Sequence, residues 1–152
     1  MSAQLSSVTE GVNTGQRLTG STAANHGDIG DEAVDLSYSN SASTTRGATG
    51  TASTAMGEGT TASGDYSTAM GESTTASGYY STAMGSYTNA SGWYSTAMGR
   101  STAASGYYST AMGYSATASG SRSTAMGYGT TASNYYSTAM GSYTNASGWY
   151  ST

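Results

Sequence analysis

Several residue types are missing from this sequence of 152 residues, which contains no cysteine, proline, phenylalanine or lysine. Without cysteine, the chain can form neither disulfides nor thiolate metal sites. No stretch approaches the ~20 consecutive apolar residues that a membrane-spanning helix needs, so we expect no insertion into a membrane. The N-terminal segment from Met1 to Gly20 also lacks the apolar run that marks a secretory signal peptide.

Charge is scarce as well, and it is unevenly distributed along the chain. Only 8% of the residues are charged, and the formal net charge is −4. Residues 1–38 carry five carboxylates against Arg17 and account for the whole of this charge, whereas residues 39–152 are neutral overall. A nucleic-acid-binding protein has the opposite pattern, a basic patch or stripe. We therefore expect no nucleic-acid partner.

The main feature of the sequence is a 14-residue repeat that recurs without insertion. The string Ser-Thr-Ala-Met-Gly occurs seven times, and each copy is followed by Ala-Ser-Gly or, once, by Ala-Ser-Asn. A degenerate copy precedes the array, with residues 39–43 followed in phase by Ala48-Thr49-Gly50. The repeat is too short for two helices, and glycine, serine and threonine disfavour helix, so two short strands and two turns fit better. The methionines that mark the repeat are Met56, Met70, Met84, Met98, Met112, Met126 and Met140.

Alternation within the repeat predicts which side chains lie inside. We expect two strands in each coil, both about five residues long, with successive side chains on opposite faces. Thr68 and Met70 then point to one side, and the small residues around them point to the other. A coil made of a single repeat encloses little volume, so Ser67, Ala69 and Ala76 are expected inside. The sequence therefore predicts an all-β protein, a narrow parallel solenoid in which each 14-residue repeat forms one coil.

Stacking of the coils aligns the outward residues into stripes along the solenoid. The stripe of methionines is a continuous apolar ridge, which a soluble monomer seldom exposes. Burial of this ridge against copies of the same chain in a closed homo-oligomer is the simplest solution. In the alternative, methionine fills gaps inside the roll, which the small interior disfavours. The predicted oligomer interface consists of Thr68, Met70, Met84, Met98, Met112, Met126 and Met140.

Over residues 39–152, the pattern Ser-x-Ala-x-Gly followed by Ala-x-Gly resembles the head repeat (Hep/Hag repeat) of the YadA-like trimeric autotransporter adhesins. The resemblance implies a left-handed parallel β-roll in a homotrimer, with the three chains intertwined or side by side. The strand typical of that family reads Ser-Val-Ala-Ile-Gly, so Thr68 and Met70 occupy the places that face the trimer axis. No heptad stalk or membrane-anchor segment is recognisable in this sequence. Similar repeats occur in phage tail fibres and other surface filaments, which need neither part.

Aromatic residues gather at the two turns of the repeat, where the copies differ from one another. Because neighbouring coils lie ~4.8 Å apart, each turn is expected to carry a ladder of rings. Such a ladder either binds sugars or proteins, or stacks on itself and shields the coil ends, at ~0.5–1.5 kcal/mol per pair. One turn carries Tyr87, Tyr114, Tyr128 and Tyr143. The other carries the candidate ligand-binding residues Tyr79, Tyr80, Trp93, Tyr94, Tyr107, Tyr108, Tyr135, Tyr136, Trp149 and Tyr150.

Residues 1–38 lie outside the repeat and hold every leucine, valine and isoleucine of the chain. We expect two parts: residues 1–38 form a small conventional core that caps the solenoid or attaches to another protein, and residues 39–152 form the repeat array. His26 is the only histidine, and the serines of the repeat have no base to activate them. The acidic run at residues 27–31 lacks the spacing of an EF-hand loop. We therefore predict no enzyme, no cofactor and no metal site.

These patterns favour a structural or adhesive subunit of a surface fibre or filament that binds glycans or surfaces through its aromatic ladders. The alternative is a purely structural filament, or a phage tail-fibre shaft, without a ligand. Ice binding is a third and weaker possibility, because a Thr-x-Thr strand is expected there and this strand reads Thr-Ala-Met. The expected partners are further copies of the chain, which also stack end to end in a filament, and a glycan or host surface. We expect an extracellular location, on a cell surface or a virion, where Asn89 and Asn145 in sequons become glycosylated if the source organism does so.

Overall fold

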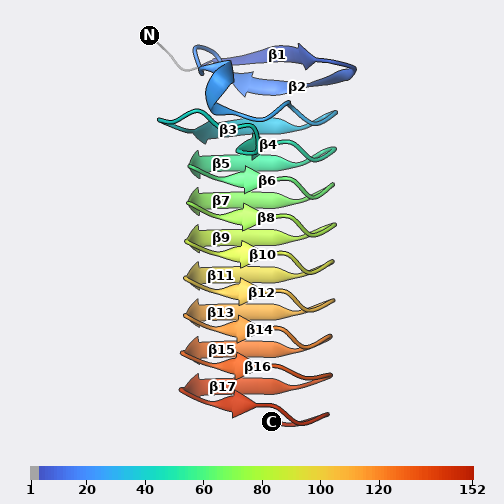
Figure 1. The fold of residues 1–152 in the computed structure, drawn as a ribbon, viewed down its shortest axis with the longest axis vertical. Helices are drawn as coiled ribbons and strands as arrows, with labels where there is room; N and C mark the ends of the chain where they lie inside the picture. The colour runs from blue at the N-terminus through green and yellow to red at the C-terminus, as the bar shows by residue number, and fades with distance from the viewer. Residues whose placement is uncertain (1–3) are drawn as a thin grey trace.

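Each 14-residue repeat folds into one coil that contributes one strand to each of two parallel sheets (Figure 1). The computed structural model describes residues 4–152. The long strands of the repeats are β5 (Thr54–Glu58), β7 (Thr68–Glu72), β9 (Thr82–Ser86), β11 (Thr96–Arg100), β13 (Thr110–Tyr114), β15 (Thr124–Tyr128) and β17 (Thr138–Ser142). The short strands are β4 (Gly47–Ala48), β6 (Thr61–Ala62), β8 (Thr75–Ala76), β10 (Asn89–Ala90), β12 (Ala103–Ala104), β14 (Thr117–Ala118), β16 (Thr131–Ala132) and β18 (Asn145–Ala146).

Every repeat strand pairs in parallel with the same strand of the next coil, and equivalent residues lie side by side. Ala69 pairs with Ala55 on one side and with Ala83 on the other. The predicted parallel solenoid is thus confirmed. The second strand of each coil, however, has two residues rather than five. The N–H groups of Ser77 and Gly78 both donate to the carbonyl of Ala90, so the regular ladder ends there and the chain turns.

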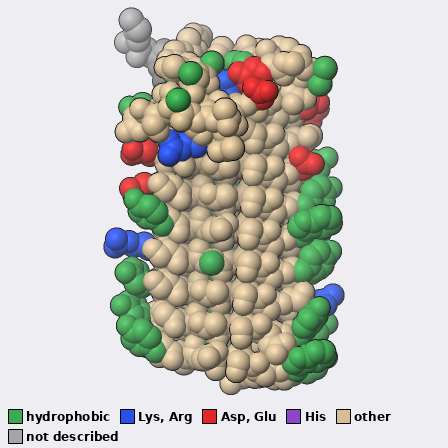
Figure 2. All heavy atoms as spheres, viewed as in Figure 1, with side chains coloured by type: hydrophobic (Ala, Val, Ile, Leu, Met, Phe, Trp, Pro, Cys, Tyr) green, Lys and Arg blue, Asp and Glu red, His purple; other side chains and the backbone are tan. Residues whose placement is uncertain are grey.

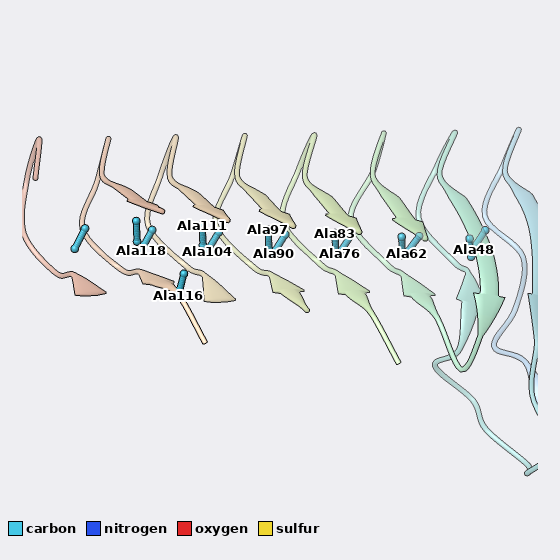
Figure 3. Packing of buried hydrophobic residues seen from close by; sticks show 14 of the residues in the cluster. Ala48, Ala62, Ala76, Ala83, Ala90, Ala97, Ala104, Ala111, Ala116 and Ala118 are labelled. Atoms are coloured by element: carbon cyan, nitrogen blue, oxygen red, sulfur yellow. The ribbon is translucent and has the colours of Figure 1, made fainter. Parts of the chain in front are cut away.

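The interior of the roll consists of small side chains, as the alternation predicts. Ser67, Ala69 and Ala76 are buried, and the alanines of successive coils form two facing rows (Figure 3). A row of threonines, Thr74 and its equivalents, is buried beside them. Because the enclosed space is so narrow, each coil is stabilised mainly by hydrogen bonds to its neighbours and by the contacts of these rows.

The stack begins before the repeat array, at β3 (Val34–Tyr38), which pairs in parallel with β5. The degenerate copy expected at residues 39–43 therefore does not form the long strand of this coil. Val34 and Leu36 alternate in the way that Thr54 and Met56 do, and they take the corresponding positions. This first coil is longer than the others because residues 39–46 form an additional loop.

The N-terminal end of the column is an antiparallel hairpin of β1 (Leu5–Glu10) and β2 (Asn13–Leu18), followed by a short 3-10 helix, Ala23–Asn25 (Figure 1). Strand β2 pairs in parallel with β3, so the hairpin continues the larger sheet. The prediction of a conventional apolar core in residues 1–38 is wrong. Among its leucine, valine and isoleucine side chains only Ile29 is buried, while Val12 is 96% exposed. Within residues 4–152, no helix is long and apolar enough to cross a membrane.

Candidate functional site

The aromatic residues form two columns along one edge of the roll, which we call the paired edge. This edge is the set of turns that lead from each short strand to the next long strand. Hydrophobic side chains line both long edges of the molecule (Figure 2). The stacked column consists of Tyr66, Tyr80, Tyr94, Tyr108, Arg122, Tyr136 and Tyr150. The second column consists of Asp65, Tyr79, Trp93, Tyr107, Ser121, Tyr135 and Trp149.

The rings of the stacked column lie face to face from coil to coil. Successive centroids are 4.7, 5.4 and 4.8 Å apart, with interplanar angles of 9°, 5° and 11°, along Tyr66, Tyr80, Tyr94 and Tyr108. In the next coil Arg122 replaces the ring, and its guanidinium carbon is 5.8 Å from the ring centroid of Tyr108 and 5.3 Å from that of Tyr136. Tyr136 then stacks on Tyr150 at 5.0 Å. The column therefore continues through a cation–π contact on each side of the arginine.

The backbone of the turn explains why these rings point the same way in every coil. Each member of the stacked column has a φ between 54° and 57°, in the left-handed region that non-glycine residues seldom adopt. The N–H of Tyr80 donates to the carbonyl of Asp65 at 3.0 Å, and that of Tyr94 to the carbonyl of Tyr79 at 2.8 Å. These bonds hold each turn on the preceding one. Ring stacking, at ~0.5–1.5 kcal/mol per pair, offsets part of the cost of the backbone conformation.

The second column lies edge-on against the stacked column. The ring of Tyr79 is perpendicular to that of Tyr80 at 4.5 Å, and Tyr107 has the same relation to Tyr108. Desolvation by the neighbouring rings and a hydrogen bond with Tyr80 raise the pKa of Tyr79. The hydrogen bond with Tyr108, followed by desolvation, raises the pKa of Tyr107. The phenols of these two residues are therefore neutral at physiological pH and present uncharged rings to solvent.

The paired edge exposes broad aromatic faces. Trp93 is 56% exposed and Trp149 is 69% exposed. Tryptophan and tyrosine provide a large contact area with little side-chain entropy to lose, which suits the recognition of sugar rings and protein surfaces. The sequence-predicted candidate residues are thus brought together in one array that is both stacked and exposed.

The opposite edge carries a shorter group of tyrosines. Tyr114 stacks on Tyr128 at 5.0 Å, and Arg100 lies 5.7 Å from the ring centroid of Tyr114. Tyr128 meets Tyr143 edge-on at 5.0 Å. A hydrogen bond and the proximity of Tyr143 raise the pKa of Tyr128. This edge has fewer rings and less continuous stacking than the paired edge, so it is the weaker candidate.

The methionines point away from the alanine rows, on the outer face of the larger sheet. Each methionine pairs in register with the next, as Met98 does with Met84 and Met112. They are exposed or half-buried in the single chain, which rules out the alternative that they fill the interior. The ridge extends one coil further than the repeat indicates, because Leu36 pairs with Met56. We call the row from Leu36 to Met140 the methionine ridge.

A buried cluster of charged groups closes the N-terminal end of the roll, and no pattern in the sequence indicates it. The carboxylate of Asp35, at the position that alanine takes in the next coil, accepts from Nε of Arg17 at 3.3 Å. His26 Nδ1 lies 3.1 Å from the same carboxylate oxygen, and Ser37 Oγ donates to the other oxygen at 2.6 Å. Arg17 also donates to Glu10 at 2.8 Å. These contacts pair groups that are costly to bury alone.

This cluster contains serine, histidine and aspartate, but its geometry is not that of a catalytic triad. Ser37 Oγ and Asp35 both approach Nδ1 of His26, at 3.3 and 3.1 Å. A triad needs the serine and the carboxylate on opposite ring nitrogens, so that the proton of the hydroxyl has a route to the base. In the part of the chain that the structure describes, no group of three or more histidine or carboxylate side chains could hold a metal ion.

Glu10 makes the stability of the N-terminal hairpin depend on pH in the acidic range. Partial burial acts to raise the pKa of Glu10, but hydrogen bonds from Arg17 and from the N–H of Ile29, with the charge of Arg17, outweigh it and lower the pKa below its ordinary value of 4.5. Stabilisation from a carboxylate with a lowered pKa is present above about pH 4.5 and is lost as the pH falls through the folded-state pKa. We expect the protection of β1 and β2 against hydrogen exchange, taken relative to the intrinsic exchange rate at each pH, to fall below pH 4.5, and Glu10→Gln to reduce this change. Glu58→Gln, on the exposed end of β5, is the control, and an unaltered acid response in Glu10→Gln would contradict the role of Glu10.

Comparison with known proteins gives one finding. The family model described as the YadA head domain repeat, which contains two copies of the repeat, matches residues 48–74, 76–102, 104–130 and 132–152. These matches follow one another along the array and together cover more than half of the chain. No curated protein matches the sequence.

Proposed function

Because this chain belongs to the YadA head repeat family, we propose that it is part of a surface fibre whose paired edge binds glycans on another surface. The family is one of adhesin heads, so the role is structural and adhesive rather than catalytic. The observation that supports binding at this edge is the exposed array of aromatic rings that recurs from coil to coil. Rings at a regular spacing offer a repeating set of faces to a repeating ligand such as a polysaccharide.

Affinity is expected in the turns because the strands are occupied with packing. Strand residues are nearly identical from coil to coil, and they either pack inside the roll or belong to the methionine ridge. The unit Gly-Ser-Tyr-Thr-Asn-Ala-Ser-Gly-Trp-Tyr-Ser-Thr occurs twice without change, at residues 85–96 and 141–152. Its tryptophans are four coils apart, about 19 Å at the usual strand spacing. Two equal sites at this separation give avidity to contacts that are weak one at a time.

We also propose that the fibre is a homotrimer with the methionine ridge on its axis. The ridge is a continuous row of large apolar side chains on a molecule of low charge. Soluble proteins cover such rows, and closed symmetric assembly covers them with a second copy of the same row. The typical family strand has apolar residues at the same two positions as Thr68 and Met70.

Residues 1–38 are proposed to cap this fibre. The hairpin joins the larger sheet through the parallel pairing of β2 with β3 and ends it with the antiparallel strand β1, and the buried polar cluster of Arg17, His26 and Asp35 fills the end of the narrow interior. Both features suit a terminal unit, which has to differ from the repeats that it covers. The proposed division at residue 38 leaves β3, the first strand of the column, within the cap.

The double variant Trp93→Ala with Trp149→Ala tests the binding role of the paired edge. Both side chains lie in turns and are more exposed than buried, so the fold should remain intact. Binding to a glycan-coated surface should fall at least tenfold, about 1.4 kcal/mol. Glycan arrays and surface plasmon resonance on the assembled protein measure the change, and circular dichroism checks the fold.

The matched control is the single variant Tyr143→Ala, which removes an exposed ring from the opposite edge. It should leave binding within a factor of two of the unaltered protein. If the double variant instead melts far earlier or loses its assembly, the rings are structural, and the purely structural filament is the better description. If it folds and binds unchanged, the tryptophans are not the binding site.

A further inference from the structure

One coil of the second column of the paired edge has no ring although the coils on both sides of it have one. Tyr107 and Tyr135 lie two coils apart, and the coil between them carries Ser121 where its neighbours carry an aromatic residue. The missing ring leaves a hollow of about 360 Å³ that is open to solvent. Tyr107 and Tyr135, from the coils on either side of Ser121, line the hollow together with Gly106 and Gly120. We call this hollow the open rung.

The spacing of the open rung suits one flat ring. Two coils correspond to about 9.6 Å, twice the usual strand spacing. In the occupied part of the column, Trp93 lies 5.6 Å from Tyr79 and 6.3 Å from Tyr107. A six-membered ring placed midway between Tyr107 and Tyr135 would therefore have an aromatic neighbour at about 4.8 Å on each side. The ligand would take the place of the absent side chain.

The lining of the open rung is polar as well as aromatic. The two glycines that line it are buried, and a Cβ at either would collide with the backbone of the next coil. The exposed hydroxyls of Ser105, Ser119 and Ser133 line the same hollow in three successive coils. Hydroxyls act as both donors and acceptors, and aromatic faces pack against the C–H groups of a sugar ring. This combination favours a polyhydroxylated ring over a hydrocarbon.

A positive charge lies beside the open rung. Arg122 belongs to the same coil as Ser121, and its guanidinium carbon lies 5.8 Å from the ring centroid of Tyr108 and 5.3 Å from that of Tyr136. In the preceding coil the ring of Tyr107 is 4.5 Å from Tyr108 and perpendicular to it. The guanidinium group of Arg122 therefore lies beside the open rung, at the position that the ring of Tyr108 has beside Tyr107. A carboxylate is the natural acceptor for the N–H groups of a guanidinium.

The charge of the surrounding coils supports this choice of ligand. Residues 73–152 contain Arg100 and Arg122 and no aspartate or glutamate. An anionic ligand at the open rung therefore meets no carboxylate of its own coils or of the coils on either side. The carboxylates of the array are confined to its N-terminal coils, at Glu58, Asp65 and Glu72.

We propose that the open rung binds one acidic pyranose unit of a glycan, with its ring between Tyr107 and Tyr135 and its carboxylate on Arg122. This inference deepens the proposed function and rests on it, because it specifies the sugar that the paired edge recognises. Hexuronic acids and nonulosonic acids share the required chemistry, a pyranose ring with a carboxylate. The other rungs of the edge contribute further contacts to neighbouring sugar units.

Ser121→Tyr tests the proposal because it closes the open rung with the residue that three other coils have in the second column. The probes are the methyl glycosides of glucuronic acid and of N-acetylneuraminic acid, with methyl glucoside as the neutral reference, titrated by NMR into the assembled protein. The unaltered protein should bind at least one acidic glycoside at least tenfold more tightly than the neutral one, and the two acidic probes identify the sugar class. Ser121→Tyr should weaken that binding at least tenfold, whereas Ser121→Ala, which keeps the rung open, should change it less than threefold.

Two further variants distinguish the effects involved. One tests the charge of Arg122 apart from the space of the open rung, and the other tests the open rung apart from the two tryptophans. Arg122→Gln should remove the preference for the acidic glycoside while the neutral one binds as before. Trp93→Ala with Trp149→Ala should keep monosaccharide binding, because neither side chain lines the hollow. The proposal that the open rung binds an acidic sugar would be overturned if Ser121→Tyr and Ser121→Ala bound the acidic probes equally. It would also be overturned if the unaltered protein did not bind them. The proposed function is decided separately, by the binding of intact glycans to the tryptophan double variant.

Discussion

Gly85→Ala is expected to destabilise the roll by roughly 2–6 kcal/mol, from backbone strain and overpacking together. Gly85 lies in β9 with a φ of +121°, a conformation that residues with a side chain rarely adopt. A Cβ at this position would also overlap the carbonyl oxygen of Gly99 in the next coil. Neither coil can move away without breaking hydrogen bonds to its own neighbours. Urea unfolding followed by circular dichroism measures the loss.

Two other glycines separate the causes of this effect. Gly141 has a similar φ of +116°, but it lies in the last coil and a Cβ there would meet only Cγ2 of Thr144, at 3.6 Å. Gly141→Ala should therefore show the backbone cost alone, about 1–3 kcal/mol. Gly59 has a φ of +62°, and its equivalent in the next coil is Ser73 with a φ of 51°. Gly59→Ser should cost about 1–2 kcal/mol, the cost of the left-handed backbone alone, because a Cβ there would make only ordinary contacts. An alanine at residue 85 that is tolerated as well as serine at residue 59 would mean that the coils are not packed this closely.

Met98→Asp is expected to dissociate the proposed homotrimer. Met98 lies in the middle of the methionine ridge, paired with a methionine on each side. On a threefold axis, the substitution places three carboxylates in a dry interface, at several kcal/mol per ion and with mutual repulsion. Sedimentation equilibrium or light scattering should show monomers or aggregates where the unaltered protein is a trimer.

Asn89→Asp is the matched control for the ridge variant. Asn89 is exposed on the short-strand sheet, on the other face of the roll. The substitution adds the same charge with almost no change in shape, so the assembly should persist. A stable trimer of Met98→Asp would mean that the methionine ridge does not face the trimer axis. If the unaltered protein is a monomer, the proposed homotrimer itself is contradicted.

The repeat array could be predicted from the sequence because its constraint is local and repeated. Period-2 alternation together with a small enclosed volume was enough to place Ser67, Ala69 and Ala76 inside. The length of the second strand was not predictable in this way. It ends where the N–H groups of Ser77 and Gly78 both donate to the carbonyl of Ala90, a detail of the turn that alternation does not encode.

The N-terminal end was predicted less well because its contacts join residues without a common period. Arg17, His26 and Asp35 come together through a hairpin and the long first coil, and their spacing in the sequence carries no recognisable pattern. The apolar residues of this segment suggested a conventional core, yet Val34 and Leu36 lie on the outer face of the sheet with the threonines and methionines. The open rung presented a different difficulty. Ser121 is visible in the sequence as a variant residue, but only the register of the coils places it between Tyr107 and Tyr135.

The in-register pairing of identical coils affects how the correct strand register is selected during folding. If a chain slipped by one whole repeat during folding, nearly every alanine would again meet an alanine and every methionine a methionine. The array alone therefore hardly distinguishes correct from shifted pairing, and the slip must be penalised at an end. Asp35 supplies that penalty, because it has to meet Arg17 and His26 and no repeat offers a substitute. The N-terminal unit thus fixes the register of the whole column. Gain or loss of one repeat changes the length of the fibre by about 4.8 Å and leaves its cross-section unchanged.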